Sequence, residues 1–439
     1  MIHPVALFAL LVSCVSAQPA FPTSFQRGIV FGSGEWSHPA FPYGSPGAAA
    51  SLRALAETGA SHVRLLVTGY LDNGANATRV YSIAPPSALA TETVPQFSAA
   101  VAAAHELGLV VVLCPVLDPN WDILPSGSRS SDSPTSTWRG EIGRGFTSQA
   151  DWEAFFASYR AWVWPYFIAA AALGVATIQV SSELDTAFLQ QEPAWRALVA
   201  DIRAIPFAGA VSIAVDASVA AALPWADALD IVGVDMYAGL GEALPLGTAP
   251  TVDALVASYA ATVLPQLVPL FDRNLTVVLS ETGFQSRPNC HVRPSGTQLL
   301  DPDDDSAWLL VVDTACQANA YEALLRFLSS ETRIVGVFLW LWRSDPTTGG
   351  TYNSDFTPHG KPAGLCRWVR FKLTTSTHTL PHSRTHPVFL HRRGRTEALV
   401  WKLLMPARWR VRCGFPCAAT RGNAARAALH RHARRSMRW

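Results

Sequence analysis

Lysine is almost absent from this chain of 439 residues. It occurs only at Lys361, Lys372 and Lys402, so the chain before Lys361 contains none. A Walker A phosphate loop, a barrel aldolase that forms a Schiff base and a pyridoxal enzyme each require a lysine. The sequence therefore excludes all three classes of protein.

Motifs of other common hydrolases are missing as well. The sequence has neither an H-E-x-x-H zinc motif nor a G-x-S-x-G nucleophile motif, and its seven cysteines fit no metal spacing. The histidines before Lys361 are scattered along the chain and form no ligand pattern. We therefore expect no metal, no cofactor and no Ser-His-Asp triad. Carboxylates and tryptophans, by contrast, are frequent at the ends of apolar runs.

Acidic and basic residues are segregated along the chain. Residues 365–439 contain 17 lysines and arginines and one acid, Glu397, whereas the rest of the chain has 17 bases and 32 acids. This segment shows no periodicity, so we expect a disordered basic tail. Two interpretations stay open: a basic arm that binds an anionic glycan rather than nucleic acid, or a mistranslated segment from a frame error or retained intron. We favour the second, and expect no nucleic-acid partner.

The N-terminus resembles a secretory signal peptide. Val5–Val15 is a short apolar run, and Val15-Ser16-Ala17 forms a small-residue cleavage site before Gln18. We therefore expect residues 1–17 to be removed. The mature protein is expected to be secreted and to have no membrane anchor.

A secretory route would permit two covalent modifications. The sequons that begin at Asn76 and Asn274 are acceptors for N-glycosylation in that compartment. Cys290 and Cys316 can form a disulfide between a long loop and the helix after it, or they can remain two free thiols.

The first 364 residues alternate apolar β runs with helix-like stretches. Eight strand candidates lie at Gly28–Phe31, His62–Val67, Val110–Leu113, Thr177–Val180, Val211–Val215, Ile231–Asp235, Thr276–Ser280 and Ile334–Trp340. Helix candidates lie at Ala48–Thr58, Thr91–Leu107, Gln149–Leu173, Gln191–Ile205, Thr251–Leu270 and Thr314–Ser329. Several of them end in a glycine just before the next strand, as at Gly59, Gly108 and Gly174.

Eight nearly all-apolar runs in this rhythm predict parallel strands that are covered on both sides. The expected fold is a single (β/α)₈ TIM barrel over residues 26–364. The rival is an open, doubly wound sheet, which would carry a Gly-rich phosphate turn after its first strand. Gly32-Ser33-Gly34-Glu35-Trp36 does not complete such a turn.

Two strand candidates end in a glutamate. The fourth ends Val180-Ser181-Ser182-Glu183, and the seventh ends Leu279-Ser280-Glu281. Active sites of barrels lie at the C-terminal ends of their strands, and a buried glutamate is costly unless it is paired. Glycosidases use two such carboxylates. The alternative for each glutamate is that it only bonds loop backbone.

An ordered series of motifs resembles clan A glycoside hydrolases, and most closely glycoside hydrolase family 113, the β-mannanase family. The matching segments are residues 68–73, 138–142, 230–237, 280–284, 336–346 and 355–362. They occur in the family's order between about Arg27 and Pro362. Each motif alone is weak, but the series is specific.

The resemblance implies roles for several of these residues. Glu183 is expected to be the acid/base, Glu281 the nucleophile, and Tyr237 a tyrosine that bonds the nucleophile. Trp340 and Trp342 are expected to share one face of the eighth strand, with at least one of them forming the apolar floor under the sugar.

Three further residues are expected to contact neighbouring sugars: Trp138, Arg139 and Asp118, for which surface or loop-structural roles remain alternatives. The chain also departs from the family's pattern. Ser182 stands where many clan members have an asparagine, and Cys114 and Val116 stand where family 113 has Lys and His. These departures leave the sugar open.

The resemblance implies a retaining hydrolase of β-linked polysaccharide, closest in type to a β-1,4-mannanase. Alternatives are a clan A hydrolase of another β-glycan and a non-catalytic barrel that binds glycans, although the intact glutamate pair argues against the latter. The expected partner is a polysaccharide or oligosaccharide, and the expected state is a monomer. A retaining mechanism would place the two carboxyl groups about 5–5.5 Å apart, and an inverting one about 6.5–9.5 Å.

Overall fold

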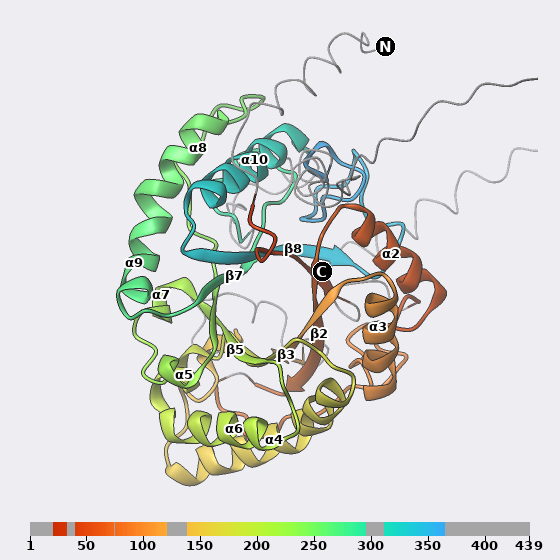
Figure 1. The fold of residues 1–439 in the computed structure, drawn as a ribbon, viewed down its shortest axis with the longest axis vertical. Coiled ribbons are helices and arrows are strands. Elements are labelled where there is room, and N and C mark those ends of the chain that lie inside the picture. The colour runs from red at the N-terminus through yellow and green to blue at the C-terminus, as the bar shows by residue number, and fades with distance from the viewer. Residues whose placement is uncertain (1–20, 33–39, 74, 121–137, 296–310, 365–439) are drawn as a thin grey trace, which may run out of the picture. The chain divides into compact units, whose positions relative to one another are not determined.

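A computed structural model describes residues 21–32, 40–73, 75–120, 138–295 and 311–364. Within them, eight parallel strands close into a barrel in chain order, which confirms the predicted TIM barrel (Figure 1). The expected signal peptide and the basic tail lie outside the described residues. The strands are β1 (Gln26–Gly32), β2 (His62–Leu71), β3 (Val110–Pro119), β4 (Thr177–Ser182), β5 (Ala210–Asp216), β6 (Ile231–Asp235), β7 (Val277–Thr282) and β8 (Ile334–Arg343).

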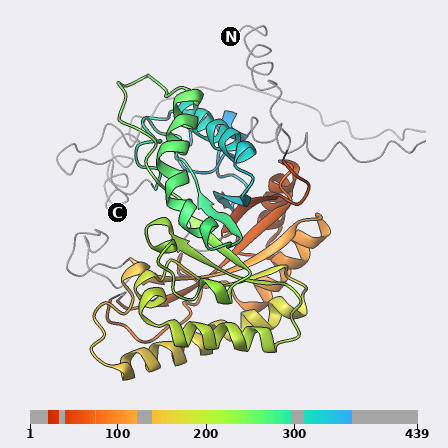
Figure 2. The same cartoon turned by 60° about the vertical axis from the view of Figure 1, so that its left-hand side comes forward.

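Helices cover the outside of the barrel between successive strands (Figures 1 and 2). The described helices are α2 (Pro46–Glu57), α3 (Val94–Glu106), α4 (Gln149–Ala172), α5 (Asp185–Gln190), α6 (Glu192–Ala204), α7 (Ala217–Ala220), α8 (Val252–Ser258), α9 (Leu264–Asp272) and α10 (Thr314–Ser330). A π-helical turn, η4 (Tyr259–Val263), joins α8 to α9, and η2 (Arg139–Glu141) and η3 (Ala226–Ala228) are 3₁₀ turns.

The helix ends follow from the local sequence. Thr93 and Ser148 begin α3 and α4 with capping boxes, because each side chain accepts from a first-turn N–H. Gly59, Gly108 and Gly174 follow α2, α3 and α4 with φ of 83°, 73° and 69°. Glycine adopts this left-handed conformation at little cost, so it ends each helix directly before the next strand.

The run from Val252 to Asp272 is apolar and long enough to span a membrane by length and composition. Its residues at helical spacing, Leu255, Tyr259, Val263, Leu267 and Leu270, are buried in the hydrophobic core. The exposed positions are largely alanine and proline. The run is thus explained as an amphipathic helix of the barrel's outer layer, beside α10 (Figure 2).

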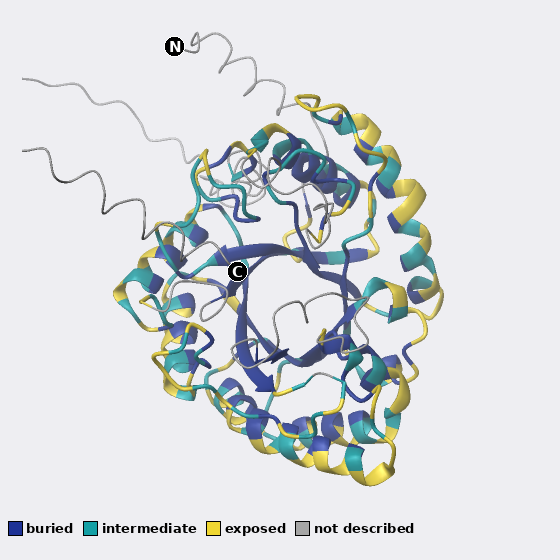
Figure 3. Cartoon of the chain, turned by 180° about the vertical axis from the view of Figure 1, so that it is seen from behind, coloured by how far each residue is buried: buried dark blue, intermediate teal, exposed yellow. Residues whose placement is uncertain are grey.

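The hydrophobic core has two layers. The larger lies between the strands and the surrounding helices, and the strands are buried along almost their whole length (Figure 3). The smaller consists of strand residues together with Phe356, and lies inside the barrel. Its buried members are Val30, Leu66, Val112, Cys114, Val116, Val278, Phe338, Trp340, Leu341 and Phe356.

The register shifts in three strands near their C-terminal ends. β4 advances from Gln179 to Ser182 while β5 advances by two residues, and β7 advances from Leu279 to Glu281 while β6 advances by one. β8 advances from Leu339 to Trp342 while β1 advances by two. Such bulges redirect side chains and are frequent beside active sites.

Candidate active site

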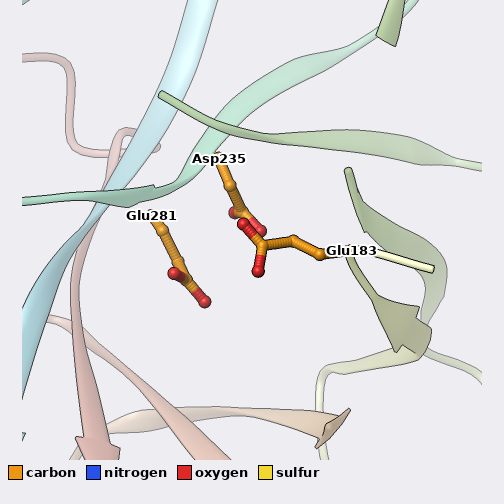
Figure 4. Close-up of side chains that lie close together, drawn as sticks. All are labelled: Glu183, Asp235 and Glu281. Carbon is orange, nitrogen blue, oxygen red and sulfur yellow. The ribbon is translucent and has the colours of Figure 1, made fainter. Parts of the chain in front are cut away.

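The two glutamates predicted from the strand ends meet at one end of the barrel. Glu183 follows β4 directly and Glu281 lies in β7, and they are 8% and 4% exposed. Together with Asp235 of β6, each contributes a carboxylate oxygen to a group in which all such oxygens lie within 4.8 Å of one another (Figure 4). The fold thus brings together side chains that are 98 positions apart in the sequence.

The backbone of Glu183 has a left-handed conformation, with a φ of 51°. A non-glycine residue in this region stores strain, and such residues cluster at functional sites. The main-chain N–H of Glu183 donates to the carbonyl oxygen of Ala214 at 2.9 Å, which ties the turn to β5. The strained turn therefore holds the carboxyl group over the barrel.

Both carboxylate oxygens of Glu281 accept hydrogen bonds. Arg64 Nη1 donates to Oε1 at 2.6 Å, and the Tyr237 hydroxyl donates to Oε2 at 3.2 Å. Arg64 is fully buried and also donates from Nε to Gln179 Oε1 at 2.6 Å. The hydrogen bond expected between Tyr237 and Glu281 is present, so donors from two separate segments of the chain hold both oxygens of this carboxyl group.

Arg64 was missed by the sequence analysis. The signal for it was a single charged residue within an otherwise apolar strand, His62-Val63-Arg64-Leu65-Leu66. A buried guanidinium needs acceptors, and Glu281, Gln179 and the carbonyl oxygen of Ser280 provide them. Nothing in the local sequence says which residues these are.

Glu183 has a different environment. Arg139 Nη1 donates to Oε2 at 2.8 Å, and no hydrogen bond from another described residue reaches Oε1. Burial raises the pKa of Glu183 to about 8, and Glu281, Asp185 and Asp216 raise it too, while Arg139 opposes them. Glu183 therefore holds a proton near neutral pH, as an acid catalyst requires.

Arg139 and Asp118 form one buried network with Glu183. Arg139 Nε donates to Asp118 Oδ1 at 3.0 Å and to the carbonyl oxygen of Leu117 at 3.0 Å. Both side chains were expected to contact sugars, and the structure shows Arg139 bonded to Asp118 and to Glu183. Their contact with a sugar remains a prediction, as does that of Trp138, which is 40% exposed.

Asp235 is a third carboxyl group that the sequence analysis quoted only as part of a motif. It is fully buried, and Ser280 Oγ donates to its Oδ1 at 2.6 Å. Its Oδ2 has no hydrogen-bond partner among the described residues. Burial and then Glu281 raise the pKa of Asp235 well above its ordinary value.

The oxygens of Glu183, Asp235 and Glu281 are close enough together to serve as metal ligands. The arginines beside these carboxyl groups make a bound cation unfavourable. The guanidinium groups of Arg64 and Arg139 already bond two of the three carboxylates and would repel an added cation.

The expectation that Trp340 and Trp342 share one face of β8 is wrong. Trp340 belongs to the hydrophobic cluster inside the barrel, against which Tyr237 also packs. Trp342 belongs to the outer core and donates from Nε1 to Ser51 Oγ of α2 at 2.9 Å. The bulge between Leu339 and Trp342 explains the difference, because one extra residue reverses the alternation of side chains. Only Trp340 remains a candidate for the sugar floor.

The sequence also predicted sites for two covalent modifications. Cys290 and Cys316 are buried with their sulfur atoms 2.6 Å apart, and the structure shows them as free thiols. Asn76 and Asn274 are exposed, as glycosylation would require.

The family model of Glycoside Hydrolase Family 113 matches residues 33–361. A search of curated proteins gave no match.

Two similar solved structures have the same fold. One is a GH113 β-mannanase from Alicyclobacillus acidocaldarius in complex with ManMIm, with 24% identity, a TM-score of 0.61, and coverage of 81% of this chain and 100% of that one. The other is a complex of a GH113 β-1,4-mannanase, with 21% identity, a TM-score of 0.58, and coverage of 79% and 99%. At such identities, these structures show the shared fold. The family model covers most of the barrel, and on that ground the chain belongs to glycoside hydrolase family 113 and is an O-glycosyl hydrolase.

Proposed function

We propose that this protein is a retaining hydrolase of a β-linked mannan-type polysaccharide, with Glu281 as nucleophile and Glu183 as acid/base. The observation that carries the proposal is the difference in hydrogen bonding between the two carboxyl groups. Both oxygens of Glu281 accept hydrogen bonds that hold the carboxyl group in place, whereas Oε1 of Glu183 accepts none from the described residues and can carry a proton. The separation of the carboxylate oxygens, within 4.8 Å, supports direct attack rather than the wider spacing that would hold a water.

In the first step, a Glu281 oxygen attacks the anomeric carbon while the bond to the leaving oxygen breaks. Glu183 donates its proton to that oxygen, and a glycosyl ester forms on Glu281. Arg64 and Tyr237 hold the attacking carboxylate in place through their hydrogen bonds. Each polar contact is made in a buried site, where electrostatic interactions are stronger than in water.

In the second step, the ionised Glu183 takes a proton from water, and the resulting hydroxide attacks the anomeric carbon. The ester bond breaks, Glu281 leaves as a carboxylate, and Glu183 is again protonated. Two inversions give a product with the same anomeric configuration as the substrate. Trp340 is the aromatic residue proposed to lie under the sugar ring, because apolar sugar faces pack on such rings.

Support for mannan comes from the similar structures, one of which is described as a β-1,4-mannanase and the other as a β-mannanase. A different β-glycan is the second candidate, because Ser182 replaces the usual asparagine. Ser182 is fully buried, and Arg64 Nη2 lies 3.5 Å from its hydroxyl. Cys114 and Val116 are also buried within the inner apolar cluster, so they would give a sugar few polar contacts.

The test is a reducing-sugar assay of the full-length protein on a panel of mannan, β-glucan and galactan. NMR spectra recorded in the first minutes of cleavage should show the β-anomer of the product, before mutarotation. An α-anomer as first product would exclude the retaining mechanism, and activity confined to β-glucan or galactan would exclude mannan. We also propose that the protein acts outside the cell, on the basis of its N-terminal sequence, and that it is a monomer.

A further inference from the structure

Arg139 is the hydrogen-bond donor to the carboxyl group of Glu183 among the described residues. It lies in η2, its side chain is only 11% exposed, and it bonds a single oxygen of Glu183. A guanidinium group donates hydrogen bonds and never accepts them. Oε2 of Glu183 must therefore present a lone pair to Arg139, and a proton on this carboxyl group is left to Oε1.

The orientation of Arg139 is itself fixed by other groups. Nε and Nη2 both donate to Asp118 Oδ1, and Nε also donates to the carbonyl oxygen of Leu117. These contacts come from the end of β3 and hold the guanidinium plane. A long side chain loses much entropy when it is ordered, so an anchor of this kind makes the bond to Glu183 more precise.

We propose that Arg139, anchored by Asp118, is a positioning residue that orients Glu183 and assigns the catalytic proton to Oε1. Its catalytic consequence rests on the proposed function of Glu183 as acid/base. The orientation itself follows from the network and does not depend on the substrate.

The same contact adjusts how readily Glu183 releases its proton. Burial and the neighbouring carboxyl groups raise the pKa of Glu183, and the positive charge of Arg139 lowers it. Without Arg139 the proton would be held more tightly, and Glu183 would be a weaker acid in the first step. The titratable and charged groups that face Glu183 are Arg139 from η2, Asp185 from α5, Asp216 before α7, Asp235 from β6, Tyr237 after β6, and Glu281 from β7.

The first test needs no substrate. The side-chain carboxyl carbons of glutamate are labelled with ¹³C in the full-length protein, and the Glu183 signal is assigned with Glu183→Gln. In Arg139→Met, the titration midpoint of Glu183 should rise by at least about one pH unit, since an opposite charge at this range shifts a carboxyl pKa by about 1–3 units. Arg139→Lys keeps the charge and should restore part of the shift, and Asp118→Asn should give a smaller shift in the same direction.

The second test separates orientation from folding. On an aryl glycoside with a poor leaving group, Arg139→Met should lower kcat/KM by roughly 10²-fold, because general acid catalysis contributes about 10²–10⁴-fold. On a dinitrophenyl glycoside, whose leaving group needs no proton, kcat/KM should fall less than about ten-fold on the same principle. The alkaline limb of the pH profile of kcat/KM should move to higher pH, since Glu183 stays protonated up to a higher pH.

Arg144→Met is the matched control. Arg144 lies three residues after η2, its side chain is 67% exposed, and it pairs with Glu141. Its replacement should change neither the titration midpoint of Glu183 nor the pH profile of kcat/KM. An unchanged Glu183 midpoint in Arg139→Met, or equal losses on both aryl glycosides, would overturn the inference. If the parent cleaves no β-mannoside or mannan, the proposed function fails, and the titration still decides the role of Arg139.

Discussion

The β7 side and the β4 side of the barrel mouth each hold one glutamate, and the two glutamates differ in their hydrogen-bond donors. Glu281 and Glu183 are almost equally buried, at 4% and 8% exposure. Glu281 accepts from Arg64 and Tyr237 on its two oxygens, whereas Glu183 accepts from Arg139 on one. Burial alone therefore does not separate a nucleophile from an acid. The proposed roles rest instead on the number and placement of the hydrogen-bond donors around each carboxyl group.

The largest effect is expected from Glu281→Gln, which removes the proposed nucleophile. This is the carboxyl group that accepts hydrogen bonds on both oxygens. An amide cannot form the glycosyl ester, so kcat/KM should fall by roughly 10⁴-fold or more on every substrate. Kinetics with mannan and a nitrophenyl glycoside would measure this, with Glu192→Gln on the exposed face of α6 as the control. Normal turnover of the nitrophenyl glycoside by Glu281→Gln would reverse the assignment of the two sides.

Glu183→Gln should have a smaller and substrate-dependent effect. Cleavage of polysaccharide should fall by about 10²–10⁴-fold, while the first step should persist for leaving groups that need no proton. Azide should then restore turnover, because it attacks the glycosyl ester without help from a base. Chromatography should detect the β-glycosyl azide in this variant and not in Glu281→Gln. Failure of azide to rescue Glu183→Gln would show that the β4 side does not supply the acid/base.

On the β7 side we also expect a disulfide bond between the loop after β7 and α10. Cys290 follows β7 and lies 2.6 Å, sulfur to sulfur, from Cys316 in α10, 26 residues further along the chain. We propose that an external disulfide of the secretory route oxidises the pair: the two thiols lose two electrons and two protons, and the oxidant becomes two thiols. The loop closed by this bond predicts a contribution of about 2–4 kcal/mol to the free energy of unfolding.

Mass spectrometry with and without reduction would detect the bond, and denaturant unfolding of Cys290→Ser/Cys316→Ser would measure its contribution. Cys114→Ser is the matched control for loss of a buried thiol outside this pair. Complete alkylation of Cys290 and Cys316 without prior reduction would show that the two cysteines form no disulfide bond.

The smallest expected effect concerns Asp235, between the two sides. Its pKa is raised in the folded protein, chiefly by burial, so the folded state holds a proton that the unfolded state releases above about pH 4. Stability should therefore fall as pH rises from about 4 toward 7 on account of this group. Asp235→Asn removes that loss, and its melting temperature should exceed that of the parent by a margin that grows over this range.

Thermal unfolding at a series of pH values would measure this margin. Asp253→Asn is the control, because the carboxylate of Asp253 is 92% exposed. A margin that shrinks with rising pH would mean that Asp235 is ionised in the folded protein and pairs with Arg64.

Much of the fold could be predicted because its signals are local. All eight strands begin within two residues of their predicted starts, and the six predicted helices are present. Short elements were missed: α5 and η2 have too few residues to show a helical period. These are also the elements that place Asp185 and Arg139 beside Glu183.

The sequence by itself determined the barrel, the positions of the two strand-end glutamates and the residue types available for chemistry. Strand and helix periods, glycine stops and apolar runs are set by neighbours along the chain. Only the tertiary structure decided that Arg64 meets Glu281, that Arg139 bonds one oxygen of Glu183, and that Trp342 faces α2. Those outcomes depend on strand register, in which one extra residue in a bulge turns a side chain from the barrel interior to its outer face. A register is fixed by the neighbouring strand, and β1 and β8 are neighbours only after the barrel has closed.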